Sequence, residues 1–199
     1  MYELNVKDQK SRKFILVQLP EECDEKSVAF IEGYKNIAEL GKERIRRASK
    51  KVSDENSSYK GDLGFKSFKL SKSSFKIWNS EEDYEESQTL EESIRLYADN
   101  IDMTRNTKDI LYELVLKTGY PLTVPIEEVK ADKKIVYSIC NSQLIICLEQ
   151  KVDKKLLRAI VDMKPSEVIC LDNAFGGDDQ LKTNTVLEMK SEKIVFKTV

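Results

Sequence analysis

The chain has 199 residues, of which 40% are hydrophobic and 34% are charged, and its formal net charge is −2. This apolar content excludes an intrinsically disordered chain, and the near balance of charge excludes a general attraction to nucleic acid or to an acidic membrane surface. The longest apolar run, Leu144 to Leu148, is far shorter than the roughly 20 residues that cross a bilayer, so we expect no membrane partner.

Histidine is absent from the sequence, which excludes Ser-His and Cys-His nucleophile pairs as well as histidine-ligated metals. The four cysteines show no zinc spacing. Three of them, Cys140, Cys147 and Cys170, lie in apolar runs, so we expect reduced core residues. The first residues carry an early acid and no apolar core, which argues against a secretory signal. We therefore expect a cytoplasmic protein.

The first predicted elements are a strand and a helix. Residues 13–19 form a continuous apolar run closed by Pro20, which is typical of a buried parallel strand. From Ser27 to Val52 apolar residues recur at spacings of three and four, which predicts one long helix with a stripe facing a core. Residues 53–58 have the composition of a linker.

The middle of the chain predicts a hairpin and two helices. Residues 65–70 and 75–78 are aromatic and partly alternating around a polar turn, which indicates paired strands. A helix is expected to begin near Thr89, whose hydroxyl can cap it. A second helix is expected over 108–118, because Gly119 follows as a stop signal.

The last third predicts a small, largely parallel α/β sheet. Residues 135–139 and 144–148 flank a short polar turn, which favours a hairpin. Asp153 can cap the next helix, and the apolar run 167–171 follows as a strand. An alternation of strands and helices of this kind is typical of α/β domains.

The end of the chain predicts one more helix and strand. Asp178 or Asp179 can cap the helix, and residues 193–199 read as the closing strand. The glycines of the sequence Phe175 to Asp179 superficially resemble a phosphate loop, but the acids beside them would repel phosphate, so a helix-capping turn is favoured.

The predicted helix over 27–52 carries a basic ridge. Phosphate contacts from such a ridge would add salt-dependent affinity for DNA without reading its sequence. The alternative is a plain exposed amphipathic face, which the interspersed Glu39 and Glu43 favour. The candidate nucleic-acid residues are Lys42, Arg46, Arg47 and Lys50, with Lys51 beside them.

Magnesium-dependent nuclease chemistry is a further alternative. It needs paired acids to hold the metal and a lysine to steady the attacking water, for which Asp179, Glu188 and Lys190 are candidates. Such spacings also arise by chance in a chain this rich in charge, and a solvated helix face is the simpler interpretation.

Several strings together resemble the modification (Mod) subunit of type III restriction-modification systems, a family of adenine-N6 DNA methyltransferases. They are distributed over nearly the whole chain. At 178 this chain has Asp where the family usually has Asn. The strings are Phe14 to Glu21, Gly41 to Arg47, Phe75 to Trp78, Leu111 to Leu114 and Asp179 to Asn184.

The resemblance implies a protein that binds S-adenosylmethionine, flips an adenine out of DNA and methylates its amino group, working with DNA and with a restriction (Res) subunit. That chemistry needs an Asp-Pro-Pro-Tyr-type loop and a glycine-rich cofactor turn. Neither is present in this sequence, whose four prolines are never adjacent. We therefore expect a C-terminal portion that begins just after the cofactor loop. On its own it is expected neither to methylate DNA nor to bind the cofactor, and it is expected to have no metal-binding residues.

The resemblance also implies an organisation in two parts. Residues 1–58 are expected to be the end of a methyltransferase-type sheet, a strand plus a long helix. Residues 59–199 are expected to form a small, mostly parallel α/β C-terminal domain with a β-hairpin that serves assembly. Gln18 and Glu21 are then expected to line what remains of the cofactor-binding wall. The alternative is that they only mark the end of a strand. Exposed edges favour a homo-oligomer or pairing with a missing N-terminal part. The alternatives are the nuclease and a non-catalytic DNA-binding module.

Overall fold

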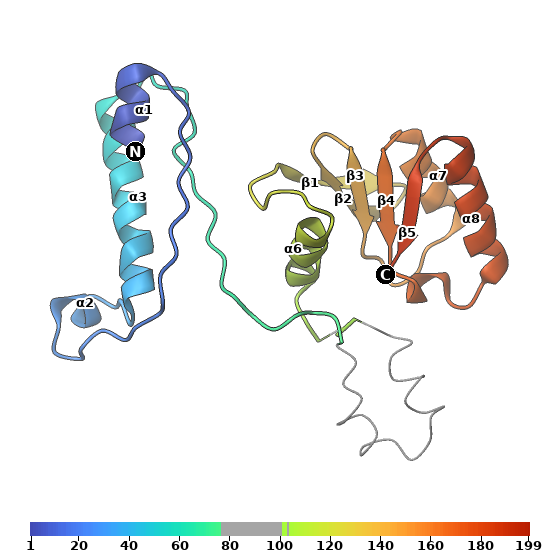
Figure 1. Ribbon diagram of the computed structural model, residues 1–199, viewed down its shortest axis with the longest axis horizontal. Coiled ribbons are helices and arrows are strands. Elements are labelled where there is room, and N and C mark those ends of the chain that lie inside the picture. Colours follow the sequence, from blue (N-terminus) through green and yellow to red (C-terminus); the bar gives the residue numbers. More distant parts are fainter. Residues whose placement is uncertain (77–100, 103) are drawn as a thin grey trace, which may run out of the picture. The chain divides into compact units, whose positions relative to one another are not determined.

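The computed structural model describes residues 1–76, 101, 102 and 104–199. The chain divides into two compact units, Met1–Leu70 and Ser71–Val199 (Figure 1). The helix predicted near Thr89 and the end of the predicted hairpin, residues 77 and 78, lie outside the described residues.

The first unit contains three helices, α1 (Tyr2–Asp8), α2 (Val28–Ile31) and α3 (Ile37–Glu55). The single helix predicted over 27–52 is therefore wrong in one respect, because it is interrupted between α2 and α3. Gly33 adopts a left-handed φ of 94° there, which a glycine accepts without steric cost. The Asn36 side chain then accepts a hydrogen bond of 2.9 Å from the Glu39 amide and starts a new helix. That helix continues into the predicted linker as far as Glu55.

The predicted buried strand over residues 13–19 is not formed. The segment is extended, but no strand is assigned there, and Ile15 and Val17 are 92% and 91% exposed. A strand is held by hydrogen bonds to neighbouring strands. Within residues 1–76, 101, 102 and 104–199, no strand pairs with this segment.

The first unit has little apolar interior. Among its residues Tyr2 and Val52 are the buried apolar side chains, and Asn5 is a buried polar one. Asn5 exchanges two hydrogen bonds with the Arg12 backbone, at 3.0 and 3.1 Å. The Tyr2 ring meets the Phe14 ring edge to face, with centroids 5.7 Å apart. Polar contacts and one aromatic pair therefore supplement a very small core.

The second unit is built on a five-stranded sheet in the order β1-β2-β3-β4-β5. The first three strands are antiparallel to one another, whereas β3, β4 and β5 are parallel. The sheet is therefore mixed, and the largely parallel sheet predicted from the sequence is only partly correct. The strands are β1 (Ile126–Ala131), β2 (Lys134–Ile139), β3 (Leu144–Cys147), β4 (Glu167–Cys170) and β5 (Val195–Thr198).

Helices connect and cover these strands (Figure 1). The predicted hairpin is confirmed as β2 and β3, and the helices expected after the Asp153 and Asp178 caps are confirmed as α7 and α8. The predicted helix over 108–118 is confirmed as α6. The bounds are α6 (Thr107–Lys117), α7 (Lys154–Asp162), the short 3-10 helix η1 (Asn173–Phe175) and α8 (Asp179–Ser191).

The start of the second unit is attached to α6 rather than forming a hairpin. Residues 65–70 form no strand, and Phe75 pairs with Ile101 in an isolated bridge. The Glu113 carboxylate accepts hydrogen bonds from the Ser73 hydroxyl at 2.5 Å and from the Ser74 amide at 2.7 Å. The described part of the predicted hairpin over 65–78 is thus wrong, since residues 65–70 form no strand and the Ser74 amide bonds the Glu113 side chain of α6.

The core of the second unit is centred on β3. All four of its residues are buried, so both faces of the strand are covered. Cys147 on β3 and Cys170 on β4 are register partners and are buried free cysteines, as predicted, whereas Cys140 is half-buried. On α7 the apolar stripe that includes Leu156 and Ile160 is fully buried. The core-facing residues of these elements follow the periodicity of the sequence.

Replacement of Leu156 by alanine tests this core. Leu156 is 0% exposed, and removing a buried leucine side chain costs about 2–5 kcal/mol through lost burial and a residual cavity. We expect this decrease in the free energy of unfolding of the second unit, measured by urea denaturation followed by circular dichroism. Leu187→Ala on α8, where the leucine is 60% exposed, is the matched control and should change stability by less than about 0.5 kcal/mol. Equal losses in the two variants would contradict this core assignment.

The Asp153 cap gives a second test. Its carboxylate accepts a hydrogen bond of 2.9 Å from the Leu156 amide, which lowers the pKa of Asp153. A carboxyl group with a lowered folded-state pKa stabilises the fold above its unfolded pKa, about 3.9, and that stability is lost as pH falls through the folded value. We expect Asp153→Ala to lower stability by about 1 kcal/mol at neutral pH.

The pH dependence separates charge from capping in this prediction. Asp153→Asn retains an oxygen acceptor but cannot titrate, so its free energy of unfolding should vary less with pH than that of the parent chain between about pH 5 and 2. Denaturation at a series of pH values measures this difference. An unchanged pH profile in the Asn variant would show that the cap does not titrate with folding.

Candidate nucleic-acid interface

Basic side chains are concentrated on α3. Between Lys42 and Lys51 the helix carries six basic residues and one acidic residue, Glu43. Because an α-helix has 3.6 residues per turn, residues four apart lie on one side of it. Lys42, Arg46 and Lys50 therefore form a stripe along the helix, as the sequence predicts.

Acidic neighbours neutralise part of this stripe. Lys42 Nζ lies 2.5 Å from Glu39 Oε1, and Arg47 Nε lies 2.9 Å from Glu43 Oε1. The hydrogen bond from Arg47 is the main reason that the pKa of Glu43 is lowered. Lys42 and Arg47 thus have the partners expected of an exposed amphipathic face.

Arg46 and Lys50 are less constrained. Arg46 Nη1 is 3.6 Å from Glu43 Oε2, which is longer than a hydrogen bond. Within the described part of the chain, the other ion pairs of α3 engage Lys42, Arg47 and Lys51, and none includes Lys50. These two cations are therefore the members of the stripe with the weakest internal pairing.

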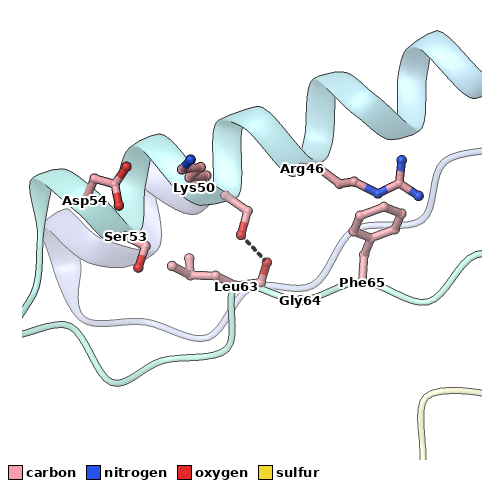
Figure 2. A pocket seen from close by; sticks show the side chains of 8 residues that line it. Arg46, Lys50, Ser53, Asp54, Leu63, Gly64 and Phe65 are labelled. Carbon is pink, nitrogen blue, oxygen red and sulfur yellow. Dashed lines mark hydrogen bonds between the residues drawn. The ribbon is translucent and has the colours of Figure 1, made fainter. Parts of the chain in front are cut away.

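The same two cations border a shallow groove between α3 and the chain segment that returns beside it (Figure 2). The groove encloses about 440 Å³. Its walls are fixed by two hydrogen bonds, from the Ser49 hydroxyl to the Leu63 carbonyl at 2.8 Å and from the Tyr2 hydroxyl to the Gly64 carbonyl at 3.4 Å. The lining residues are Arg46, Ser49, Lys50, Ser53, Asp54, Leu63, Gly64 and Phe65.

Sequence reasoning missed the second wall of this groove. It assigned Phe65 to a hairpin, whereas the structure places the half-buried Phe65 ring below the Arg46 guanidinium (Figure 2). A signal was present in the mixture of aromatic residues with Lys66 and Lys69. Aromatic residues interleaved with basic ones also occur at nucleic-acid interfaces.

The predicted cofactor-wall residues lie elsewhere in the first unit. Gln18 and Glu21 are exposed, and neither lines the groove. The Gln18 amide donates a hydrogen bond to the neighbouring Leu19 carbonyl at 3.1 Å, and the Glu21 carbonyl accepts one from the Ile37 amide at 2.9 Å. Their role towards a cofactor stays a prediction.

The candidate nuclease residues are not brought together. Asp179 begins α8 and Glu188 lies near its end, which separates them by about 13 Å along the helix at 1.5 Å per residue. Magnesium ligands lie about 2.0–2.1 Å from the ion, so these acids cannot share one. Glu188 instead forms an ion pair with Arg158, whose Nε lies 3.6 Å from Glu188 Oε1. Among the described residues no group of three or more potential ligands could hold a metal ion.

The glycines before α8 form a helix-capping turn, as predicted. Gly176 and Gly177 have φ values of 59° and 78°, and Asp178 accepts a hydrogen bond of 2.8 Å from the Leu181 amide. Lys182, which lies in one of the strings that carry the family resemblance, forms an ion pair with Asp172. This region is therefore explained by local structure.

Within residues 1–76, 101, 102 and 104–199, none of the helices has the length and apolar character that crossing a membrane requires. No protein family model matches the chain. The Mod subunit of the type III restriction-modification enzyme EcoP15I of Escherichia coli is 30% identical over 204 aligned residues. That alignment covers 97% of this chain and 28% of the relative. The resemblance seen in the sequence is thus confirmed: nearly the whole of this chain is similar to part of a type III Mod subunit.

Proposed function

We propose that the chain is the C-terminal portion of a type III Mod subunit and that it serves assembly and DNA scaffolding without performing methyl transfer alone. The similarity to the EcoP15I Mod subunit supports the relationship, and the chain spans 28% of that relative's length. The sequence holds no adjacent prolines and no glycine-rich cofactor turn, which supports a division of labour with another part of the protein.

The observation that carries this proposal is the apolar segment Phe14 to Leu19, which is exposed beyond Phe14. Ile15, Leu16 and Val17 point their side chains into solvent although all three are strongly apolar. Consecutive apolar residues suit a strand with both faces covered, as in parallel sheets. We infer that this segment is a strand of a methyltransferase-type sheet whose neighbouring strands belong to the rest of the Mod subunit.

The two parts expected from the sequence take different roles in this proposal. Residues 1–58 complete the catalytic sheet, and residues 59–199 form the assembly domain. The continuous core around β3 supports a domain that holds its own fold while it contacts other subunits.

The proposed partners follow from the same relationship. In the complete subunit we propose S-adenosylmethionine as cofactor, DNA and the Res subunit as partners, and a cytoplasmic location. Gln18 and Glu21 are proposed to face the cofactor, since amide and carboxylate groups hydrogen-bond ribose hydroxyls. Lys42, Arg46, Arg47 and Lys50 are proposed to contact DNA phosphates.

Association of the isolated chain tests the role of the exposed segment. Without partner strands, we expect the chain to self-associate at high concentration through this segment. Size-exclusion chromatography with light scattering should show a rise in mass with concentration. The double variant Ile15→Lys with Val17→Lys should remain monomeric, because charged side chains oppose strand burial.

A matched variant controls for general stickiness in this experiment. Val28 and Ile31 on α2 are similarly exposed but lie outside the segment, so Val28→Lys with Ile31→Lys should still associate. A chain that stays monomeric at every concentration, or equal loss of association in both variants, would remove the support for the proposed strand.

Methyl transfer provides the direct functional test. The purified chain, incubated with S-adenosylmethionine and duplex DNA, should leave adenine unmethylated, because the residues that clamp the extruded base are missing. Mass spectrometry of digested DNA measures N6-methyladenine, and an active full-length Mod subunit is the positive control. Methylation by this chain alone would overturn the proposal.

A further inference from the structure

The groove beside α3 combines features that the proposed phosphate contacts do not use. Arg46 lies above the Phe65 ring at one end, the Asp54 carboxylate lies at the other end, and Lys50 lies on α3 between them (Figure 2). We propose that this groove binds one nucleotide of single-stranded nucleic acid, with its phosphate held by Arg46 and Lys50 and its base stacked on Phe65. The proposal rests on the DNA-scaffold role proposed above and specifies which form of nucleic acid the first unit takes.

The phosphate end is defined by Arg46 and Lys50. They are four residues apart on the same side of α3, so both can reach one phosphate group. Their internal pairing is weak, as the distance of 3.6 Å between Arg46 and Glu43 shows. A phosphate therefore has no strong intramolecular ion pair to displace, in contrast to Lys42 and Arg47, which are held closely by carboxylates.

The base end is defined by Phe65. Its half-buried ring lies at the groove with the Arg46 guanidinium turned toward it (Figure 2). Any base can stack on an aromatic ring, since every base has a π face. Bases inside a duplex are already stacked on one another and cannot reach a ring on a protein surface without being extruded. A half-buried ring beside a cation at the protein surface therefore favours a single strand over a duplex.

The surroundings of the groove favour a polyanion aligned along it. The wall formed by α3 has an excess of basic residues, and the opposite segment, residues 60–69, carries three lysines and one aspartate. Asp54 lies at the far end from Arg46 (Figure 2), where its charge repels phosphate. The phosphate is thereby directed to the Arg46 end.

Fluorescence anisotropy with the 199-residue chain tests this inference. The probes are a labelled oligothymidylate of about 12 nucleotides and a duplex of the same length, titrated over a range of salt concentrations. We expect the single strand to bind more tightly than the duplex. Arg46→Ala with Lys50→Ala should weaken single-strand binding at least tenfold and reduce the salt slope by about 0.7, because the two cations hold one phosphate.

Two further variants separate the parts of the site. Phe65→Leu should weaken single-strand binding by roughly five- to 150-fold, the range for one stacked base, while leaving the salt slope unchanged. Arg44→Ala with Lys51→Ala removes the same charge from α3 outside the groove and is the matched control, which should bind nearly as the parent does. Circular dichroism verifies that all variants retain the helical content of the parent.

The outcomes distinguish this site from the broader scaffold role. Equal or tighter binding of the duplex, with no effect of Phe65→Leu, would overturn the nucleotide site while the DNA-scaffold role stands. Equal losses in the two charge-removal variants would show general electrostatic attraction and overturn the groove as well. Binding of neither probe would overturn both proposals.

Discussion

Burial of apolar strands on both faces is the constraint on which the rest of this molecule depends. In the second unit β3 satisfies it, because neighbouring strands and helices enclose all four of its residues. In the first unit the segment Phe14 to Leu19 has similar apolar character but remains exposed. One chain therefore contains both a completed α/β core and an apolar segment that is left exposed.

The basic side chains of α3 differ in how closely they are paired with carboxylates. The helix α3 buries Val52 and makes surface ion pairs such as Arg47 with Glu43. Arg46 has a longer contact of 3.6 Å with Glu43, and both Arg46 and Lys50 border the groove. Because surface ion pairs contribute little to folding, the helix can present these cations to an anionic ligand at a small cost in stability.

The parts of the fold that the sequence predicts correctly are those governed by local physics. The caps at Asp153 and Asp178 are short-range hydrogen bonds, and the turn between β2 and β3 is a short-range connection. The break of the predicted helix over 27–52 at Gly33 and Asn36 is also local, but other predictions failed because they depend on distant partners. Residues 13–19 need neighbouring strands to become a strand. The edge strand β1 is not predicted from the sequence, because Glu127, Glu128 and Lys130 obscure the alternation of apolar and polar residues.

The candidate site shows the same limit. The basic stripe on α3 follows from helical periodicity alone, so Lys42, Arg46 and Lys50 were identified from spacing. The groove required residues 63–65 to return beside the helix, held by Ser49 and Tyr2, and no local pattern encodes that contact. Asp179 and Glu188 are suitable metal ligands by residue type, but they lie far apart because both are on the single helix α8.

The uncovered segment Phe14 to Leu19 also has a consequence for how the protein is produced. A short apolar stretch of high β-propensity with few charges is the composition that stacks into cross-β fibrils. On the proposed function, a newly synthesised chain would partition between insertion of this segment into the catalytic sheet and misfolding with identical copies. Misfolding would rise with the concentration of unassembled copies, so the supply of the partner strands would need to keep pace with synthesis.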